Sequence, residues 1–287
     1  MRIVLQTAES LCTRFSAAVG CIESWGAFPP PNGQFEVIAD NLMNLELLWF
    51  AGTYARNQTV LDIANSHVRR MMKDLFQPAS ISGGGCVWHL LTYDFRTGAL
   101  LNRSSTPQGL GLDTIWSRGQ GWTVNGFAIA FRFTGDLSYL AQAQAAADCY
   151  IRQVSACCGA ASAYSWAPLW DFNATATRTV DTSAAMIAAD GIIEIAWHSE
   201  TATRARYLAF AKATIDAVLA RYAFAPGAND AVLNNGTTGF PTAGISIIYA
   251  DYYLLEAAMR WDSTPSEWRE EAAAFLAREG ANFAAPL

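Results

Sequence analysis

Apolar residues recur at the spacing of a helix face along most of this 287-residue chain. The periodicity predicts helices over residues 2–19, 41–55, 58–76, 119–134, 137–155, 182–199, 202–223, 245–260 and 266–280. Residues that end and start helices separate them: Thr134-Gly135-Asp136 is predicted to close one helix and begin the next, and Asp181-Thr182-Ser183 to cap another. Strand signals are few, so we expect an all-α protein.

Some of these segments are apolar on more than one side, as in residues 184–189 and 245–250. A helix that is apolar all round has neighbours on several sides. Paired antiparallel helices in a ring provide such neighbours, because the inner helices are buried and the outer ones are half exposed. We therefore expect a single domain over residues 1–287, built from consecutive helical hairpins.

The helical pattern stops between residues 77 and 117. Within this segment, residues 83–95 alternate enough to predict a short strand or hairpin, with Arg96-Thr97-Gly98 as its turn. An excursion of this length inside a compact domain is usually functional. We expect it to cover one mouth of the ring.

Charge and hydropathy argue against two kinds of partner. The net charge is −6 and the 19 Lys and Arg residues are scattered, so no nucleic-acid partner is expected. No stretch reaches the roughly 18 uncharged apolar residues of a membrane span, so no membrane partner is expected either. The first ten residues are typical of an amphipathic helix rather than of a signal peptide. A small anionic substrate needs only a local Arg or His.

The cysteines show no paired Cys-x-x-Cys spacing: they are Cys12, Cys21, Cys86, Cys149, Cys157 and Cys158. We therefore expect buried thiols and no metal site, and no cofactor is predicted. Asn-x-Ser/Thr sequons begin at Asn57, Asn102, Asn173 and Asn235. They are compatible with secretion in a eukaryote, whereas a bacterial source would favour the cytoplasm.

Asp40 is an acid within an otherwise apolar run, residues 37–50. Burying a carboxylate is costly, and it persists where neighbours hydrogen-bond it or where a raised proton affinity is useful, as in a catalytic acid. Asp followed by Asn and an apolar-periodic stretch also fits a helix N-cap. The two interpretations are compatible, because a carboxyl group at a pocket-facing helix start can also donate a proton.

A second informative stretch covers residues 108–122, where glycines flank Trp116, Arg118 and Trp122 just before a helix. Glycines allow close approach of a ligand to the backbone, and Arg118 and Trp122 are expected one helical turn apart on one face. A guanidinium for a carboxylate and a ring for a pyranose face are what a carboxylated sugar requires.

The chain resembles the unsaturated glucuronyl hydrolases, glycoside hydrolase family 88. The resemblance extends over nearly the whole chain and rests on four segments in the family's order: residues 40–45, 116–122, 181–185 and 249–257. It implies an (α/α)6 barrel and an enzyme that acts on oligosaccharides released by polysaccharide lyases. Such an enzyme removes an unsaturated uronic acid from the non-reducing end.

The family hydrates the C4=C5 bond of an enol ether, and the resulting hemiketal falls apart to release the next sugar. The resemblance implies that Asp40 gives the proton to C4 and helps water attack C5, as a carboxyl group of raised pKa can. Five further positions match those that line the family's sugar site: Trp25, His89, Gln108, Arg118 and Trp122.

Each assignment has a structural alternative. His89 can be a structural histidine, and Arg118 can cap carbonyl groups or pair with Asp113. Trp25 and Trp122 can be core rings, since large aromatic residues dominate cores. Three other acids in the matching segments are expected to be structural, as caps and helix pairs: Asp181, Asp251 and Glu256.

The chain also departs from the family's pattern. The family carries a second important aspartate upstream of the acid, but only Glu9, Glu23 and Glu36 precede Asp40 here and none has that setting. We expect the first helices of the ring to be missing, with truncation as the favoured explanation, so that apolar faces of the first and last helices are exposed. Loss of the second carboxylate would alter the proton affinity of Asp40.

Three competing functions follow. An unsaturated rhamnogalacturonyl hydrolase shares fold and reaction, but Gln120 and residues 41–45 favour the glucuronyl branch. An inactive carbohydrate-binding descendant of the enzyme is the alternative from another class. A terpenoid cyclase is disfavoured because no Asp-rich metal-binding run is present.

Overall fold

Helices dominate the computed structural model, which describes residues 1–159, 162, 166–239, 241–280 and 283. They are α1 (Arg2–Cys12), α2 (Asn41–Ala55), α3 (Gln58–Asp74), α4 (Ala79–Ser82), α5 (Ser117–Thr134), α6 (Leu137–Cys158), α7 (Thr182–Ala196), α8 (Thr201–Tyr222), α9 (Ile248–Ser263) and α10 (Ser266–Glu279). Each predicted segment contains a helix, whereas the four-residue α4 is too short for periodicity to reveal. The prediction for residues 2–19 is too long, because α1 ends at Cys12 and the chain then forms strands.

The predicted helix boundaries are confirmed where capping residues set them. Gly135 ends α5 with a φ of 70°, and Asp136 starts α6 by accepting a hydrogen bond from Ser138 N. Asp181 caps α7 in the same way, through Ser183 N. Short polar side chains therefore fix where consecutive helices begin.

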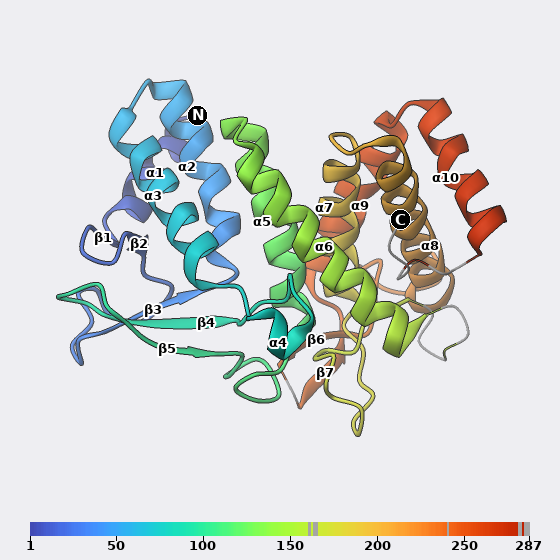
Figure 1. The fold of residues 1–287 in the computed structure, drawn as a ribbon, viewed down its shortest axis with the longest axis horizontal. Coiled ribbons are helices and arrows are strands. Elements are labelled where there is room, and N and C mark those ends of the chain that lie inside the picture. The colour runs from blue at the N-terminus through green and yellow to red at the C-terminus, as the bar shows by residue number, and fades with distance from the viewer. Residues whose placement is uncertain (160–161, 163–165, 240, 281–282, 284–287) are drawn as a thin grey trace.

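The helices pack in two layers (Figure 1). An inner series contacts in the order α2, α5, α7, α9, and α3, α6 and α8 pack outside α2, α5 and α7. Inner helices approach closely at glycines: a Cβ on Gly126 would lie 2.4 Å from Leu42 Cβ, and one on Gly191 would lie 2.8 Å from Asn125 Cα. Both contacts are too short for a side chain, so these glycines permit the α2–α5 and α5–α7 packing.

Burial differs between the two segments predicted to be apolar all round. Every residue of α7 is buried, as predicted for residues 184–189. The prediction for residues 245–250 is wrong in extent, because β7 runs to Ile245 and Ile248 is 74% exposed at the start of α9. In the described part of the chain, no neighbouring element buries this side of α9.

Exposed apolar side chains lie at both ends of the inner series. They are Phe50 and Tyr54 on α2, and Ile248, Tyr252, Leu255 and Met259 on α9. These side chains belong to α2 and α9 rather than to the first and last helices of the chain, so the exposure expected for the latter stays a prediction.

Short strands gather near one end of the helices (Figure 1). β3 (Gln34–Ile38), β4 (Leu90–Asp94) and β5 (Leu100–Ser104) form an antiparallel sheet in that order. The β4–β5 hairpin is the one predicted in the excursion. The remaining pairs are β1 (Phe15–Ser16) with β2 (Cys21–Ile22) and β6 (Gly236–Gly239) with β7 (Thr242–Ile245). Strand β3 and these pairs were not predicted, because segments of two to five residues carry little periodicity.

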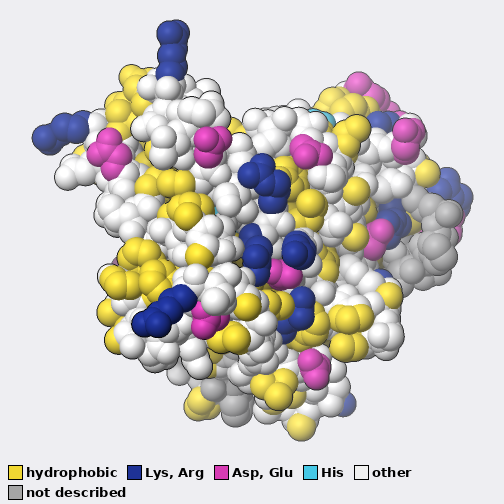
Figure 2. Space-filling view, turned by 60° about the vertical axis from the view of Figure 1, so that its left-hand side comes forward, with side chains coloured by type: hydrophobic (Ala, Val, Ile, Leu, Met, Phe, Trp, Pro, Cys, Tyr) yellow, Lys and Arg dark blue, Asp and Glu magenta, His cyan; other side chains and the backbone are white. Residues whose placement is uncertain are grey.

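The surface mixes both signs of charge. Figure 2 shows a face on which several Lys and Arg side chains gather near the middle, with Asp, Glu and hydrophobic side chains among and around them. Within the described residues, none of the helices combines the length and the apolar character that crossing a membrane takes.

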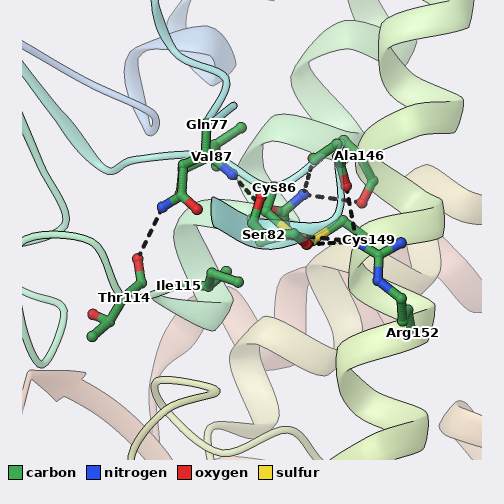
Figure 3. Close-up of a disulfide and its surroundings, with 12 residues drawn as sticks. Gln77, Ser82, Cys86, Val87, Thr114, Ile115, Ala146, Cys149 and Arg152 are labelled. Carbon is green, nitrogen blue, oxygen red and sulfur yellow. Dashed lines mark hydrogen bonds between the residues drawn. A yellow bond between two sulfur atoms is a disulfide. The ribbon is translucent and has the colours of Figure 1, made fainter. Parts of the chain in front are cut away.

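Two disulfides correct the expectation of buried thiols. Cys86 and Cys149 are bonded, with Cα atoms 5.4 Å apart and 63 positions between them, and Cys157 is bonded to Cys158. Linear spacing does not reveal the first pair, because the fold alone brings α6 to the excursion. Figure 3 shows this disulfide beside Arg152, whose Nη2 donates to Ser82 O at 3.1 Å. The bond fixes the excursion to α6 three positions before His89.

Removal of the disulfide tests its contribution to stability. We expect Cys86→Ser/Cys149→Ser to lower the free energy of unfolding by about 2–4 kcal/mol, because a cross-link over a long loop restricts the unfolded chain. Urea unfolding measures the change. Cys12→Ser, at a half-buried free cysteine, is the matched control and should change stability by less than about 1 kcal/mol. Equal losses in both variants would contradict this expectation.

Candidate active site

Asp40 lies where the β-sheet meets the helical layer. β3 ends at Ile38, and α2 begins at Asn41 with Asp40 in the N-cap position. Its carboxylate makes no capping hydrogen bond, so the simple cap interpretation accounts for its position but not for its side chain. The side chain is 29% exposed, whereas its Oδ2 atom is shielded from solvent and has no hydrogen-bond partner among the described residues. An unpaired carboxylate oxygen is thus held at a site that is open on one side.

The sheet register brings His89 to Asp40. Ile38 pairs with Leu90 across β3 and β4, and Ala39 N donates to His89 O at 2.9 Å, so the residues after β3 and before β4 meet. His89 Nδ1 lies 3.5 Å from Asp40 Oδ2. Two residues 49 positions apart therefore face each other because of strand pairing.

Gln108 sets the orientation of the imidazole. Its Oε1 is in hydrogen-bond contact with His89 Nε2. Because an amide oxygen only accepts, Nε2 carries the hydrogen, and a neutral His89 presents the lone pair of Nδ1 to Asp40. One proton between Asp40 Oδ2 and His89 Nδ1 would satisfy both atoms, which otherwise lack partners.

Burial keeps His89 neutral. It lowers the pKa of His89 below the ordinary value of 6.5, while Asp40 and the Gln108 hydrogen bond oppose this effect and Arg118 adds to it. The imidazole is 1% exposed. The imidazole is therefore neutral near neutral pH and presents an unprotonated Nδ1 to Asp40.

The Arg118 side chain is fixed in place by an ion pair and by hydrogen bonds. It is 3% exposed, and its Nη1 lies 2.5 Å from an oxygen of Asp181, the N-cap of α7. The carbonyls of Thr237 and Thr238 on β6 also accept from this guanidinium. The alternative pairing with Asp113 is wrong, because Asp113 instead accepts from Trp88 Nε1 at 3.1 Å. Among the described residues, Nε of Arg118 makes no hydrogen bond and remains able to donate.

Two aromatic residues that were not predicted to belong to the site, Trp116 and Tyr249, link the predicted ones. The Trp116 ring lies 4.4 Å from His89 and 4.5 Å from the Arg118 guanidinium carbon. Tyr249, which is 38% exposed, lies 5.7 Å from that guanidinium carbon and 6.0 Å from the Trp122 ring. Both were visible within the matching segments, but nothing in the sequence showed that they face the site.

The predicted tryptophans differ in exposure. Trp25 is 36% exposed and its ring lies 6.4 Å from His89. Trp122 is 7% exposed, packs against Tyr253 at 5.4 Å, and has no partner for its Nε1 atom in the described structure. Trp25 can offer a ring face to a ligand, whereas Trp122 mainly supports Tyr249.

The loop that carries Gln108 is anchored by a buried acid. Asp171 is fully buried, and its Oδ2 accepts from Leu110 N at 2.9 Å and from Thr114 Oγ1 at 2.7 Å. A Cβ on Gly109 would lie 2.5 Å from Ser105 O, so glycine allows this tight turn. Gln108 is thereby fixed toward His89.

Contacts connect the six predicted residues into one site. Asp40, His89 and Gln108 touch directly, Trp25 lies beside His89, and Trp116 and Tyr249 lead to Arg118 and Trp122. Among the described residues, no hydrogen bond or ion pair joins Asp40 to a second carboxyl group. No group of three His, Cys, Asp or Glu side chains in this part of the chain could hold a metal. The arrangement can hold a proton beside a sugar-sized aromatic and cationic surface.

Several known proteins are similar to this chain, although no protein-family model matches it. The unsaturated glucuronyl hydrolase of Formosa agariphila is 31% identical over 267 residues, which cover 90% of this chain and 62% of that protein. A solved unsaturated glucuronyl hydrolase specific for heparin is 30% identical with a TM-score of 0.79, covering 91% of this chain and 67% of its own. The enzyme from Bacillus sp. GL1, responsible for the degradation of glycosaminoglycan, is 28% identical with a TM-score of 0.80 and covers 90% and 67%.

The chain matches only part of the length of its relatives. The match covers 62% of the Formosa agariphila relative, which is less than two thirds of its length. The structural similarity confirms the predicted (α/α)6 barrel class.

Proposed function

The chain belongs to the unsaturated glucuronyl hydrolase family, and from this premise we propose that it removes an unsaturated glucuronic acid from the non-reducing end of oligosaccharides made by polysaccharide lyases. The reaction is hydration of the C4=C5 enol ether. One contact carries the proposal: Asp40 Oδ2 lies 3.5 Å from His89 Nδ1. In this proposal Asp40 supplies the transferable proton beside His89, which the rings of Trp25 and Trp116 approach.

Asp40 is the group that moves protons in this proposal. Its protonated carboxyl donates to C4, and the carboxylate so formed assists water in attacking C5. The hemiketal then opens, and the next sugar leaves. His89 is a positioning residue, because its Nδ1 accepts from the protonated carboxyl and keeps the proton on the side of Oδ2 that has no other partner.

The remaining residues orient the uronic acid. The Nε group of Arg118 is available for the sugar carboxylate, and Asp181 and the β6 carbonyls hold the guanidinium in place. Trp25 and Tyr249 are exposed enough to pack on a sugar ring. Gln108 keeps the imidazole turned toward Asp40, and Trp122 supports Tyr249.

Turnover of two disaccharides tests the function. We expect loss of the conjugated enol-ether absorbance with an unsaturated chondroitin disaccharide, and at least about tenfold lower kcat/KM with an unsaturated rhamnogalacturonan disaccharide. The opposite preference would favour the rhamnogalacturonyl branch. Thermal stabilisation by either sugar without turnover would favour a carbohydrate-binding protein.

Histidine titration tests the coupling of Asp40 to His89. We expect the pKa of His89 to lie below 6.5, and Asp40→Asn to lower it further, because the variant removes the negative charge that favours the imidazolium. Nuclear magnetic resonance of the ring carbon protons follows the titration. His67 is the internal control, since burial holds its pKa at about 3 and it should not respond. A rise of the His89 pKa in Asp40→Asn would contradict the arrangement.

A further inference from the structure

A second cavity, of about 710 Å³, lies outside the site described above. It is formed by the C-terminal end of α8, by residues 178–180 and by the β6–β7 region, where Asn235, Ala243 and Gly244 contribute. None of the six predicted site residues lines it. The cavity is therefore a separate feature of the fold.

Two arginines that form no ion pair among the described residues line this cavity, Arg178 and Arg221, and both are exposed. Arg178 Nε donates to Thr175 O at 3.3 Å, and the guanidinium carbon of Arg221 lies 5.8 Å from the Tyr222 ring. The described residues that line the cavity include no Asp or Glu. Other arginines behave differently: Arg118 pairs with Asp181, and Arg260 lies 2.6 Å from Asp190. Two guanidinium groups without counterions make the cavity electropositive, although the chain as a whole is acidic.

The cavity wall also contains unusual backbone geometry. Arg178 has a φ of 51° and Asn235 a φ of 58°, and both line the cavity. A positive φ costs a non-glycine residue about 1–3 kcal/mol unless the surroundings fix it. Here Arg178 N donates to Ala174 O at 3.1 Å, and Asn235 O accepts from Thr182 N at 3.1 Å. The fold thus holds both residues in place around the cavity.

The wall separates this cavity from the active site. Val180 lines the cavity, whereas the carboxylate of the next residue, Asp181, contacts Arg118. Successive side chains of an extended segment point to opposite sides. Thr237 Oγ1 donates to Val180 O at 2.8 Å and joins this segment to β6. Of these two consecutive residues, Val180 therefore lines the second cavity and Asp181 contacts the active site.

We propose that this cavity binds a tetrahedral oxyanion, sulfate or phosphate, between Arg178 and Arg221. Guanidinium groups recognise such oxygens through paired N–H donors, and Thr179 and Asn235 supply polar groups beside them. The anion is either free or an ester on a sugar. Binding does not require the proposed hydrolysis, so Asp40→Asn should leave it unchanged.

Calorimetric titration with sodium sulfate, sodium phosphate and N-acetylglucosamine 6-sulfate, at constant ionic strength, tests the proposal. We expect Arg178→Gln/Arg221→Gln to weaken binding of the anion at least about tenfold. Arg56→Gln is the matched control, because Arg56 is also exposed and has a φ of 52°. It should bind as the unaltered protein does.

The outcomes separate the two sources of the anion. Tighter binding of the sulfated sugar than of sulfate identifies an ester on a saccharide, and equal or tighter binding of the inorganic ions identifies a free anion. Equal affinity of the double variant and the Arg56→Gln control, or no binding to the unaltered protein, would overturn the proposal. Turnover by Asp40→Asn or its absence has no bearing on this result, so failure of the proposed hydrolysis remains distinguishable.

Discussion

Asp40→Asn is expected to abolish turnover of an unsaturated glucuronyl disaccharide, with a fall in kcat of about 10²–10⁴-fold or more. The amide has nearly the shape of the carboxyl group but cannot give a proton to C4 and then accept one from water. Loss of absorbance from the conjugated enol ether measures the rate. Affinity for the disaccharide should change little, because Arg118 and the aromatic surface are untouched.

Asp113→Asn is the control that separates loss of the catalytic carboxyl group from loss of folded protein. Asp113 is exposed and accepts from Trp88 Nε1, and Asp113→Asn keeps an oxygen acceptor there. We expect this control to retain activity within about threefold, since surface substitutions usually cost little stability. Undiminished turnover in Asp40→Asn would remove the basis of the assignment.

Asp181→Asn is expected to lower the free energy of unfolding by about 3–5 kcal/mol, because it leaves the guanidinium of Arg118 buried without its counterion. Both side chains are at most 3% exposed, and Asp181 also accepts from Thr237 N. Asparagine is a good N-cap, so the start of α7 is preserved and the loss reports on the ion pair. Guanidinium chloride unfolding measures the change.

The control for this variant is Asp136→Asn, at the N-cap of α6. Asp136 makes the same capping hydrogen bond, to Ser138 N, but is exposed and forms no ion pair among the described residues. Its substitution should cost less than about 1 kcal/mol. Similar losses at Asp136 and Asp181 would show that capping, and not charge pairing, dominates. In the double variant Arg118→Gln/Asp181→Asn, part of the lost stability should return, since neither charge is then left alone.

Helices were predictable because their signal is local. Spacing of apolar residues located α5, α7 and α8, and short capping residues such as Gly135 and Asp136 located their ends. Features that depend on pairing between distant residues could not be predicted in this way. Strand β3 pairs with β4, and Cys86 is bonded to Cys149, which lies 63 positions further along the chain. Such pairs cannot be predicted from local sequence patterns, because neither residue of the pair indicates by itself which distant residue it contacts.

In the candidate site too, residues with a local sequence signal were predicted, whereas contacts between distant residues were not. Asp40, Arg118 and Trp122 stood out locally, as an acid in an apolar run and as a glycine-flanked motif. Of the two structural alternatives for Arg118, contact with carbonyl groups is present, whereas the counterion is Asp181 at the start of α7 and not the nearby Asp113. The contact between Asp40 and His89 depends on the sheet register, and the orientation of the imidazole depends on Gln108, so no local sequence pattern encodes either.

Hydration at C4 and C5 can be followed directly by proton magnetic resonance of the disaccharide reaction in deuterated water. We predict that the vinyl proton signal of C4 disappears before or together with the appearance of the new reducing end, and that one deuterium is added to a single face of C4. A new reducing end that forms while the vinyl signal persists would mean ordinary cleavage at C1, and would contradict the role given to Asp40.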